Sequence, residues 1–279
     1  MSLFEHYIRE LYDIRSLGAG VNELSYYPAL SNLLNGIGGT LSPQVRCVMN
    51  LKNLGAGMPD GGLFTPNQFS KSLNVMPLEP GNPERGVIEV KGTKDDAWII
   101  AQGKQVSGYW GKYRQVLVTN LRDFVLLGQD SSGNQVKLEK YSLAPSEQAF
   151  WTAATHPHTM ADQHEENFIA FLKRVMLHNA PLTTPQEVAW FLASYAREAR
   201  TRVDRAHLDA LTAIRTALEA ALGFTFRGEQ GDRFFAQHWC KHFSTAFSLP
   251  GSCGARNTHL LTHLTVSIGK VLLGPYVFP

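Results

Sequence analysis

Apolar residues recur at helical spacing at the start of the chain. Residues 3–14, "LFEHYIRELYDI", and residues 22–38, "NELSYYPALSNLLNGIG", each place their apolar side chains on one helical face, and a glycine-rich break separates them. Asn22 is a candidate N-cap of the second helix. Pro28 predicts a kink or a late start there, because proline lacks the N–H group that a helix interior requires.

The pattern changes to strands between residues 43 and 128. Short runs rich in β-branched residues cover residues 44–50, 60–65, 86–92, 115–120 and 123–128, and the last two flank a tight turn. Residues 95–113, between the third and fourth runs, predict a helix that crosses over the sheet. Strands with interleaved helices predict an α/β domain over residues 1–145.

A helical pattern follows from residue 146. It covers residues 145–155, 161–179, 183–203 and 204–222, and Thr184 with Glu187 forms a capping-box pattern. The expected organisation is therefore a mixed sheet flanked by helices over residues 1–145, an all-helical connector over 146–235, and a tail over 236–279.

Charge is unevenly distributed along the chain. The net charge is +2, but residues 233–279 contain no Asp or Glu, so residues 1–232 carry a net charge of −2. A nucleic-acid site would have to be a local basic patch. The chain has three cysteines, no apolar run of membrane-spanning length and no signal-peptide pattern at its start, so we expect a cytoplasmic protein without a membrane segment.

Two charged residues interrupt the strand "GVIEVKG". Glu89 and Lys91 project from one face because side chains alternate along a strand. One interpretation is an edge strand with a solvated ion pair. The other is a functional site, because burying both groups without partners costs several kcal/mol. Asp60, in "MPDGGLF", is likewise either a turn residue or a carboxylate of the same site.

Together these residues have the chemistry of metal-dependent phosphodiester hydrolysis. That reaction needs carboxylates that converge on a divalent cation, and a positive group that orients water or stabilises the developing charge. The sequence "PDGG" followed by "EVK" resembles the PD-(D/E)XK superfamily of nucleases, which have the restriction-endonuclease-like fold, over about residues 15–128. The resemblance implies Mg²⁺, replaceable by Mn²⁺, held by Asp60, Glu89, Glu23 and the Val90 carbonyl, with Lys91 positioning water.

Residues further along the chain extend the resemblance to the substrate. Gln105 and Tyr109 match the Q-x-x-x-Y element of a subset of the superfamily, which implies that they orient the substrate; an ordinary amphipathic helix is the alternative. The chain also has basic residues around the expected site that either contact the phosphates of double-stranded DNA or form a solvated face. They are Lys94, Lys104, Lys112 and Arg114.

A narrower resemblance is to the N-terminal nuclease part of single-chain, type IIG-like restriction-modification enzymes with a fused adenine-specific DNA methyltransferase. The chain lacks the Asn-Pro-Pro-Tyr type of tetrapeptide, so we expect no methyltransferase activity from it. The expected function is Mg²⁺-dependent DNA cleavage by a truncated restriction-modification enzyme. The alternatives are a catalytically idle remnant that binds DNA, and a stand-alone structure-specific repair nuclease.

The tail over residues 236–279 has an aberrant composition, without acidic residues. Three interpretations stay open: a metal site around "HWCKH", a natural basic tail, or the product of a frameshift. The frameshift hypothesis predicts that the next open frame encodes methyltransferase motifs.

Overall fold

The computed structural model describes residues 1–18, 23–69, 81–178, 188–195, 197, 215–216, 219–220, 225–228 and 231. The chain forms two compact units, Met1–Pro181 and Leu182–Pro279, and the fold below is that of the first. This unit extends past the expected boundary at residue 145. The tail over residues 236–279 and most of the predicted helices over 183–222 lie outside the described residues. None of the helices in the described ranges is long and apolar enough to cross a membrane.

The two N-terminal helices form where the apolar spacing predicts them. Helix α1 spans Leu3–Ser16, and the Ser2 side chain caps it by accepting a hydrogen bond from the Glu5 backbone N–H. A 3-10 turn, η1, spans Glu23–Tyr26, and helix α2 then runs over Tyr27–Gly38 with Pro28 in its first turn. Pro28 therefore marks a late start and not a kink, because a proline at this position leaves no helical hydrogen bond unmade.

Six strands form one mixed sheet whose spatial order is the order of the sequence. The strands are β1 Arg46–Met49, β2 Gly61–Phe64, β3 Val87–Val90, β4 Val116–Thr119, β5 Asp123–Gln129 and β6 Gln135–Ser142. Only the pair β3–β4 is parallel, and the other pairs are antiparallel. The predicted α/β fold with a mixed sheet is confirmed. Strand β6 was not predicted, because it is a half-buried edge strand with several charged residues.

The connection between β3 and β4 is the predicted crossover, but it consists of two helices. Helix α3 spans Ala97–Ala101, and helix α4 spans Lys104–Tyr113. The Asp96 side chain caps α3 by accepting hydrogen bonds from two backbone N–H groups. Gly103, in an extended conformation, separates the two helices.

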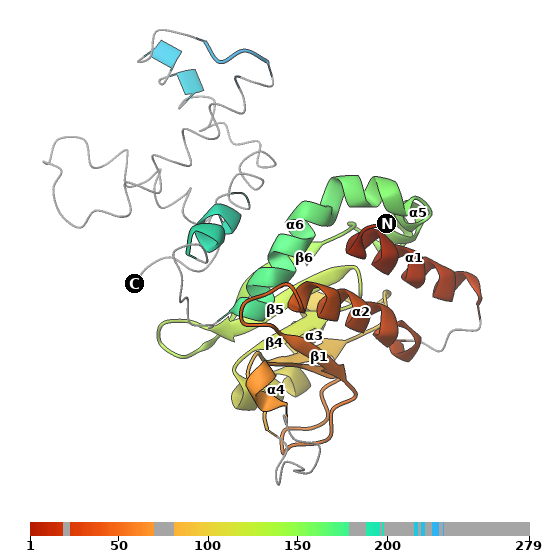
Figure 1. The fold of residues 1–279 in the computed structure, drawn as a ribbon, viewed down its shortest axis with the longest axis vertical. Helices are drawn as coiled ribbons and strands as arrows, with labels where there is room; N and C mark the ends of the chain where they lie inside the picture. The colour runs from red at the N-terminus through yellow and green to blue at the C-terminus, as the bar shows by residue number, and fades with distance from the viewer. Residues whose placement is uncertain are drawn as a thin grey trace, which may run out of the picture. The chain divides into compact units, whose positions relative to one another are not determined.

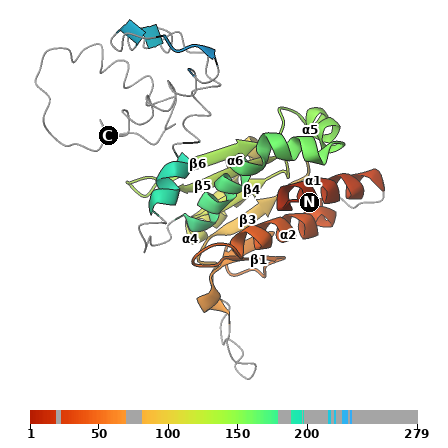
Figure 2. The same ribbon diagram turned by 45° about the horizontal axis from the view of Figure 1, so that its top comes forward.

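Helices cover both faces of the sheet (Figures 1 and 2). Val87, Val116 and Val118 pack with α3 and α4 in one core cluster. On the other face, α1 and α2 pack together with α6, Pro157–Leu177, which also contacts α5, Glu147–Ala154. The Phe124 ring of β5 reaches this second layer, where its centroid lies 4.9 Å from that of Phe168. Because side chains alternate, Glu89 projects on the same face as Val87, toward α3 and α4.

A side chain closes the outer edge of strand β1. The Asn35 amide of α2 accepts a hydrogen bond of 2.9 Å from the Cys47 N–H and donates one of 3.1 Å to the Cys47 carbonyl. Both backbone groups of Cys47 are therefore satisfied without a further strand, which blocks strand pairing at this position of the edge.

Candidate functional site

The sheet register brings the predicted carboxylates together. Gly61 pairs with Ile88 in the antiparallel pair β2–β3, so one step beyond this register Asp60 lies beside Glu89. Glu23 reaches the same place from η1, as its contact with Lys91 shows. Three segments far apart in sequence thus place acidic side chains at the end of β3.

The ammonium group of Lys91 lies within ion-pair distance of all three carboxylates. Lys91 Nζ lies 2.7 Å from Glu89 Oε1, 3.9 Å from Glu23 Oε2 and 4.0 Å from Asp60 Oδ2. It also donates a hydrogen bond of 2.9 Å to the Val90 carbonyl oxygen. Every predicted metal ligand therefore has an oxygen within 4.0 Å of one positively charged atom.

The structure excludes a solvated ion pair on an edge strand. Strand β3 lies between β2 and β4, and Glu89 is only 1% exposed. The side chains of Asp60 and Glu23 are 21% and 31% exposed. Glu89 is therefore the buried member of the cluster, and the cluster is open to solvent on the side of Asp60 and Glu23.

Asp60 is held in place by more than a turn. Its Oδ2 atom accepts a hydrogen bond of 2.7 Å from the Val90 N–H, and its carbonyl accepts one of 2.6 Å from the Asn50 N–H. The buried Tyr27 hydroxyl also lies against this carboxylate, and burial together with the Asp60 charge raises the pKa of Tyr27. The sequence offers no signal that would have selected Tyr27.

The cluster has an excess of two negative charges when its three carboxylates and one ammonium are ionised. Burial, with the charges of Asp60 and Glu23, raises the pKa of Glu89 to about 7. Burial alone would lower the pKa of Lys91, but its hydrogen bond to Glu89 and the surrounding carboxylates raise it. Burial also raises the pKa of Glu23. Such a cluster attracts further positive charge.

The oxygen donors of this cluster fit a magnesium ion chemically. Within the described residues, no three His, Cys, Asp or Glu side chains are already grouped as a metal centre. The donors are nevertheless all carboxylate or carbonyl oxygens, which Mg²⁺ prefers. Glu89 Oε2 is buried and has no hydrogen-bond partner in the described part of the chain, which leaves one oxygen open to a cation.

Tyr109 supports the segment that carries Asp60. The Tyr109 side chain is buried, and its hydroxyl donates a hydrogen bond of 3.0 Å to the Met58 carbonyl. Gln105, which is exposed, donates one of 2.8 Å to the same hydroxyl. Gly57 lies against the Tyr109 ring with φ +101°, where a Cβ atom would be 3.1 Å from the ring. Tyr109 of the Q-x-x-x-Y element therefore contacts residues 57–58, and Gln105 contacts Tyr109.

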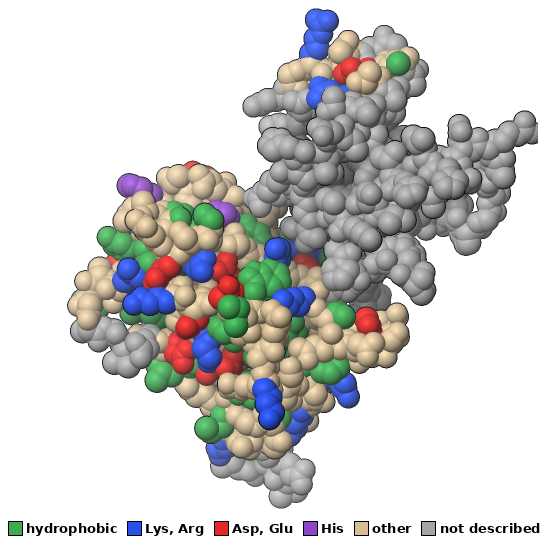
Figure 3. Space-filling view, turned by 180° about the vertical axis from the view of Figure 1, so that it is seen from behind, with side chains coloured by type: hydrophobic (Ala, Val, Ile, Leu, Met, Phe, Trp, Pro, Cys, Tyr) green, Lys and Arg blue, Asp and Glu red, His purple; other side chains and the backbone are tan. Residues whose placement is uncertain are grey.

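The predicted basic residues lie around α3 and α4. Lys94 is exposed before α3, Lys104 opens α4, and Arg114 ends α4 in a left-handed conformation with its guanidinium 5.0 Å from the Trp110 ring centroid. Lys112 Nζ lies 5.7 Å from the Tyr113 ring centroid. None of the four forms an ion pair within the described ranges. Figure 3 shows a group of acidic side chains with Lys and Arg side chains around it.

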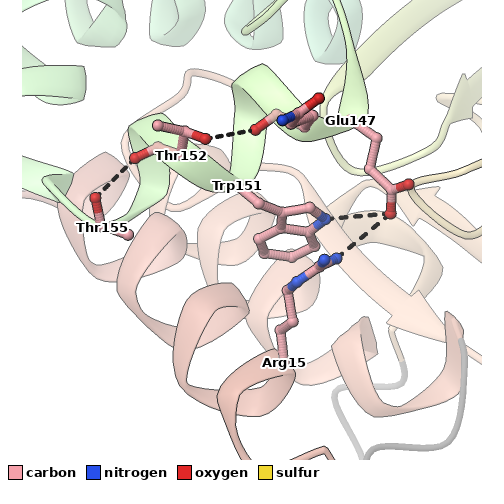
Figure 4. A pocket seen from close by; sticks show the side chains of 6 residues that line it. Arg15, Glu147, Trp151, Thr152 and Thr155 are labelled. Atoms are coloured by element: carbon pink, nitrogen blue, oxygen red, sulfur yellow. Dashed lines mark hydrogen bonds and ion pairs between the residues drawn. The ribbon is translucent and has the colours of Figure 1, made fainter.

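A second polar cluster, not predicted from the sequence, lies around Glu147, whose carboxylate contacts Trp151 and Arg15 (Figure 4). Glu147 Oε1 of α5 accepts hydrogen bonds from Thr93 Oγ1 at 2.8 Å and Trp151 Nε1 at 3.3 Å, and contacts Arg15 at 3.4 Å. The Arg15 guanidinium lies 4.4 Å from the Trp151 ring centroid. Burial would raise the pKa of Glu147, but these hydrogen bonds and the Arg15 charge lower it.

Two shallow cavities flank these clusters. One, of about 460 Å³, lies along α5; it is lined by Arg15, Glu147, Gln148, Trp151, Thr152 and Thr155. The other, of about 420 Å³, adjoins the carboxylates through Tyr27 and Asn50; its remaining lining residues are Leu24, Pro28, Ser31 and Met49.

Comparisons with solved structures find only distant similarity. No family model and no curated protein matches the chain. The chain is similar to a structure solved by cryo-electron microscopy, a DrdV–DNA complex, with 18% sequence identity and a TM-score of 0.40. The match covers 78% of this chain and spans 17% of that chain. A similarity this distant carries no argument about activity.

Proposed function

We propose that this chain contains a divalent-metal-dependent DNA endonuclease site. The observation that carries the proposal is the contact of Lys91 Nζ with Glu23, Asp60 and Glu89 at the end of a central strand. A buried carboxylate on an internal strand costs stability, and three carboxylates sharing one ammonium increase that cost. Cation binding would offset the negative charge of this cluster when its three carboxylates are ionised.

Asp60 and Glu89 would hold Mg²⁺, or Mn²⁺ in its place, together with Glu23 and the Val90 carbonyl. When bound, such an ion neutralises phosphate charge and lowers the pKa of coordinated water. Binding requires the Lys91 ammonium to leave the centre of the carboxylates. The Lys91 ammonium would then be able to donate a hydrogen bond to the attacking water or to a phosphate oxygen beside the metal site.

Gln105 and Tyr109 would have different tasks. The exposed Gln105 amide is able to contact the substrate, as the sequence resemblance implies. The buried Tyr109 acts as a positioning residue, because its hydroxyl is bonded to the Met58 carbonyl two residues before Asp60. The Q-x-x-x-Y element would thus connect substrate contact with the placement of a metal ligand.

The substrate that we propose is double-stranded DNA. Lys94, Lys104, Lys112 and Arg114 present positive charge from α3, α4 and their flanks, on the sheet face to which Glu89 projects. Such residues bind phosphates without regard to sequence. We further propose that the site is the nuclease part of a single-chain restriction-modification system, in which methylation and target recognition reside outside these residues.

Cleavage of supercoiled and linear DNA by the full chain tests the proposal. We expect cleavage with Mg²⁺ or Mn²⁺, none with a chelator, and loss of cleavage in Lys91→Ala. Equal nicking by the wild type and Lys91→Ala would contradict the proposal. Duplex binding without cleavage by the wild type would instead indicate an idle remnant.

Metal binding has a separate readout that does not need activity. Mg²⁺ should raise the melting temperature of the wild type, because a ligand of the folded state stabilises it. The rise should be lost in Asp60→Asn and retained in Asp130→Asn, which removes a carboxylate in the loop before β6 that is not part of the cluster. An equal rise in melting temperature in the wild type and both variants would contradict the proposed metal site.

A further inference from the structure

Two lysines of strand β6 converge on one tryptophan ring. Lys137 Nζ and Lys140 Nζ each lie 4.5 Å from the ring centroid of Trp98 in α3. The lysines are three positions apart, so strict alternation would place them on opposite faces of the sheet. A register shift in the β5–β6 pairing at Leu126/Leu127 places both beside α3.

The charge of this pair is not balanced within the described part of the protein. Neither Lys137 nor Lys140 forms an ion pair there, whereas Glu139 between them pairs with Arg174 of α6 at 2.8 Å. Two ammonium groups near one ring repel each other, and the ring compensates only in part through its quadrupole. A bound anion would remove this repulsion.

The lysine pair lies on the same side of the sheet as the candidate nuclease site. Trp98 packs against the core cluster of α3, α4 and Val87, and Glu89 projects on that same face. Asp95, three residues before Trp98, lies in the turn that follows Lys91, where its N–H donates a hydrogen bond of 3.0 Å to the Gly92 carbonyl. A duplex bound at the carboxylates would therefore pass near α3.

We propose that Lys137 and Lys140, supported by Trp98, bind backbone phosphates of the DNA duplex away from the phosphate that is cleaved. This inference rests on the proposed function and adds a contact surface to it. The Trp98 ring holds the two flexible lysine side chains in place, which reduces the entropy lost on binding. Contacts of this kind fix the register of a duplex and carry no sequence information.

Duplex affinity measured against salt concentration tests this surface. The full chain, without divalent metal, is titrated with duplexes of several sequences as the wild type and as Lys137→Gln/Lys140→Gln. We expect the double variant to bind roughly tenfold more weakly at physiological salt, and the slope of log K against log salt to shrink by about two. The loss should be similar for every duplex.

Two further variants exclude other causes. Lys137→Arg/Lys140→Arg keeps both charges and should retain the wild-type slope. Arg9→Gln/Lys173→Gln removes two charges from α1 and α6, on the opposite face of the sheet, and should also leave the slope unchanged. A slope that shrinks equally in this control would overturn the inference, because the effect would then be one of net charge.

The outcomes separate this inference from the proposed function. Wild-type cleavage together with an unchanged slope in Lys137→Gln/Lys140→Gln would overturn the lysine surface alone. A wild-type chain that neither binds nor cuts DNA would overturn both. A reduced slope in a chain that binds but does not cut would support the surface and contradict the nuclease proposal.

Discussion

At the scale of single residues, Lys91 places its ammonium group among three acidic side chains. Its ammonium is the nearest positive charge to Glu89 and lies within 4.0 Å of Asp60 and Glu23. Without it, the three carboxylates would repel one another in a partly buried place. Lys91 therefore has a structural task in the metal-free protein in addition to the chemical one that we propose.

Glu89 makes stability depend on pH. Because its folded pKa is about 7 and its ordinary value is 4.5, the folded state keeps a proton that the unfolded state has lost between these pH values. Stability should therefore fall as pH rises through this window, with a slope of up to about 1.4 kcal/mol per pH unit from this group. Chemical denaturation of the wild type and of Glu89→Gln at pH 4 to 8 measures how the free energy of unfolding depends on pH. If the stability difference between the two were constant with pH, the pKa shift would be refuted.

Tyr109→Phe should impair cleavage without weakening DNA binding. The substitution keeps the buried ring but removes the hydrogen bond to the Met58 carbonyl, so the segment that carries Asp60 loses support. We expect kcat to fall by roughly tenfold or more, because small displacements of catalytic groups are costly. Tyr113→Phe is the matched control, since the buried Tyr113 hydroxyl has no hydrogen-bond partner among the described residues. Equal losses in both variants would contradict the positioning role.

At the scale of secondary structure, the start of β3 depends on a glycine. Gly86 has φ +86°, and a Cβ atom there would lie 2.5 Å from the Gln115 carbonyl oxygen, which accepts the hydrogen bond of Val87. Gly86→Ala should therefore destabilise the fold by roughly 2 kcal/mol or more. Gly108→Ala in α4 meets open space and should raise stability by about 0.5–1 kcal/mol. Chemical denaturation of both variants checks the prediction, and a neutral Gly86→Ala would contradict it.

The sequence predicted those elements whose pattern is local. The alternation in β3 and the turn before β2 were sufficient to place Glu89, Lys91 and Asp60 on neighbouring strands. The burial of Glu89 was not predictable, because it depends on β2 and β4 lying on either side of β3. The hydrogen bond between Thr93 and Glu147 was not predictable either, because the two residues are 54 positions apart and belong to no motif. Strand β6 was missed because its mixed charged and apolar residues are typical of an exposed segment as well.

At the scale of the whole molecule, residues 1–181 form a compact unit of their own. Its sheet and both helical layers lie within these residues, so we expect a fragment that ends at Pro181 to unfold cooperatively by heat. The fragment should also show the Mg²⁺-dependent rise in melting temperature of the full chain. Calorimetry of both proteins tests this, and a fragment without a cooperative transition would show that Leu182–Pro279 is needed for folding.

The order of the strands has a consequence for how the protein is made. Each strand pairs with the strand synthesised just before it, so the sheet is able to grow during translation without waiting for distant segments. The layer of α1 and α6 is different, because Phe4 packs against Phe168, near the far end of the unit. We therefore expect β2 and β3, which position Asp60, Glu89 and Lys91, to pair early during synthesis, and the opposite face of the sheet to be covered only after α6 has emerged.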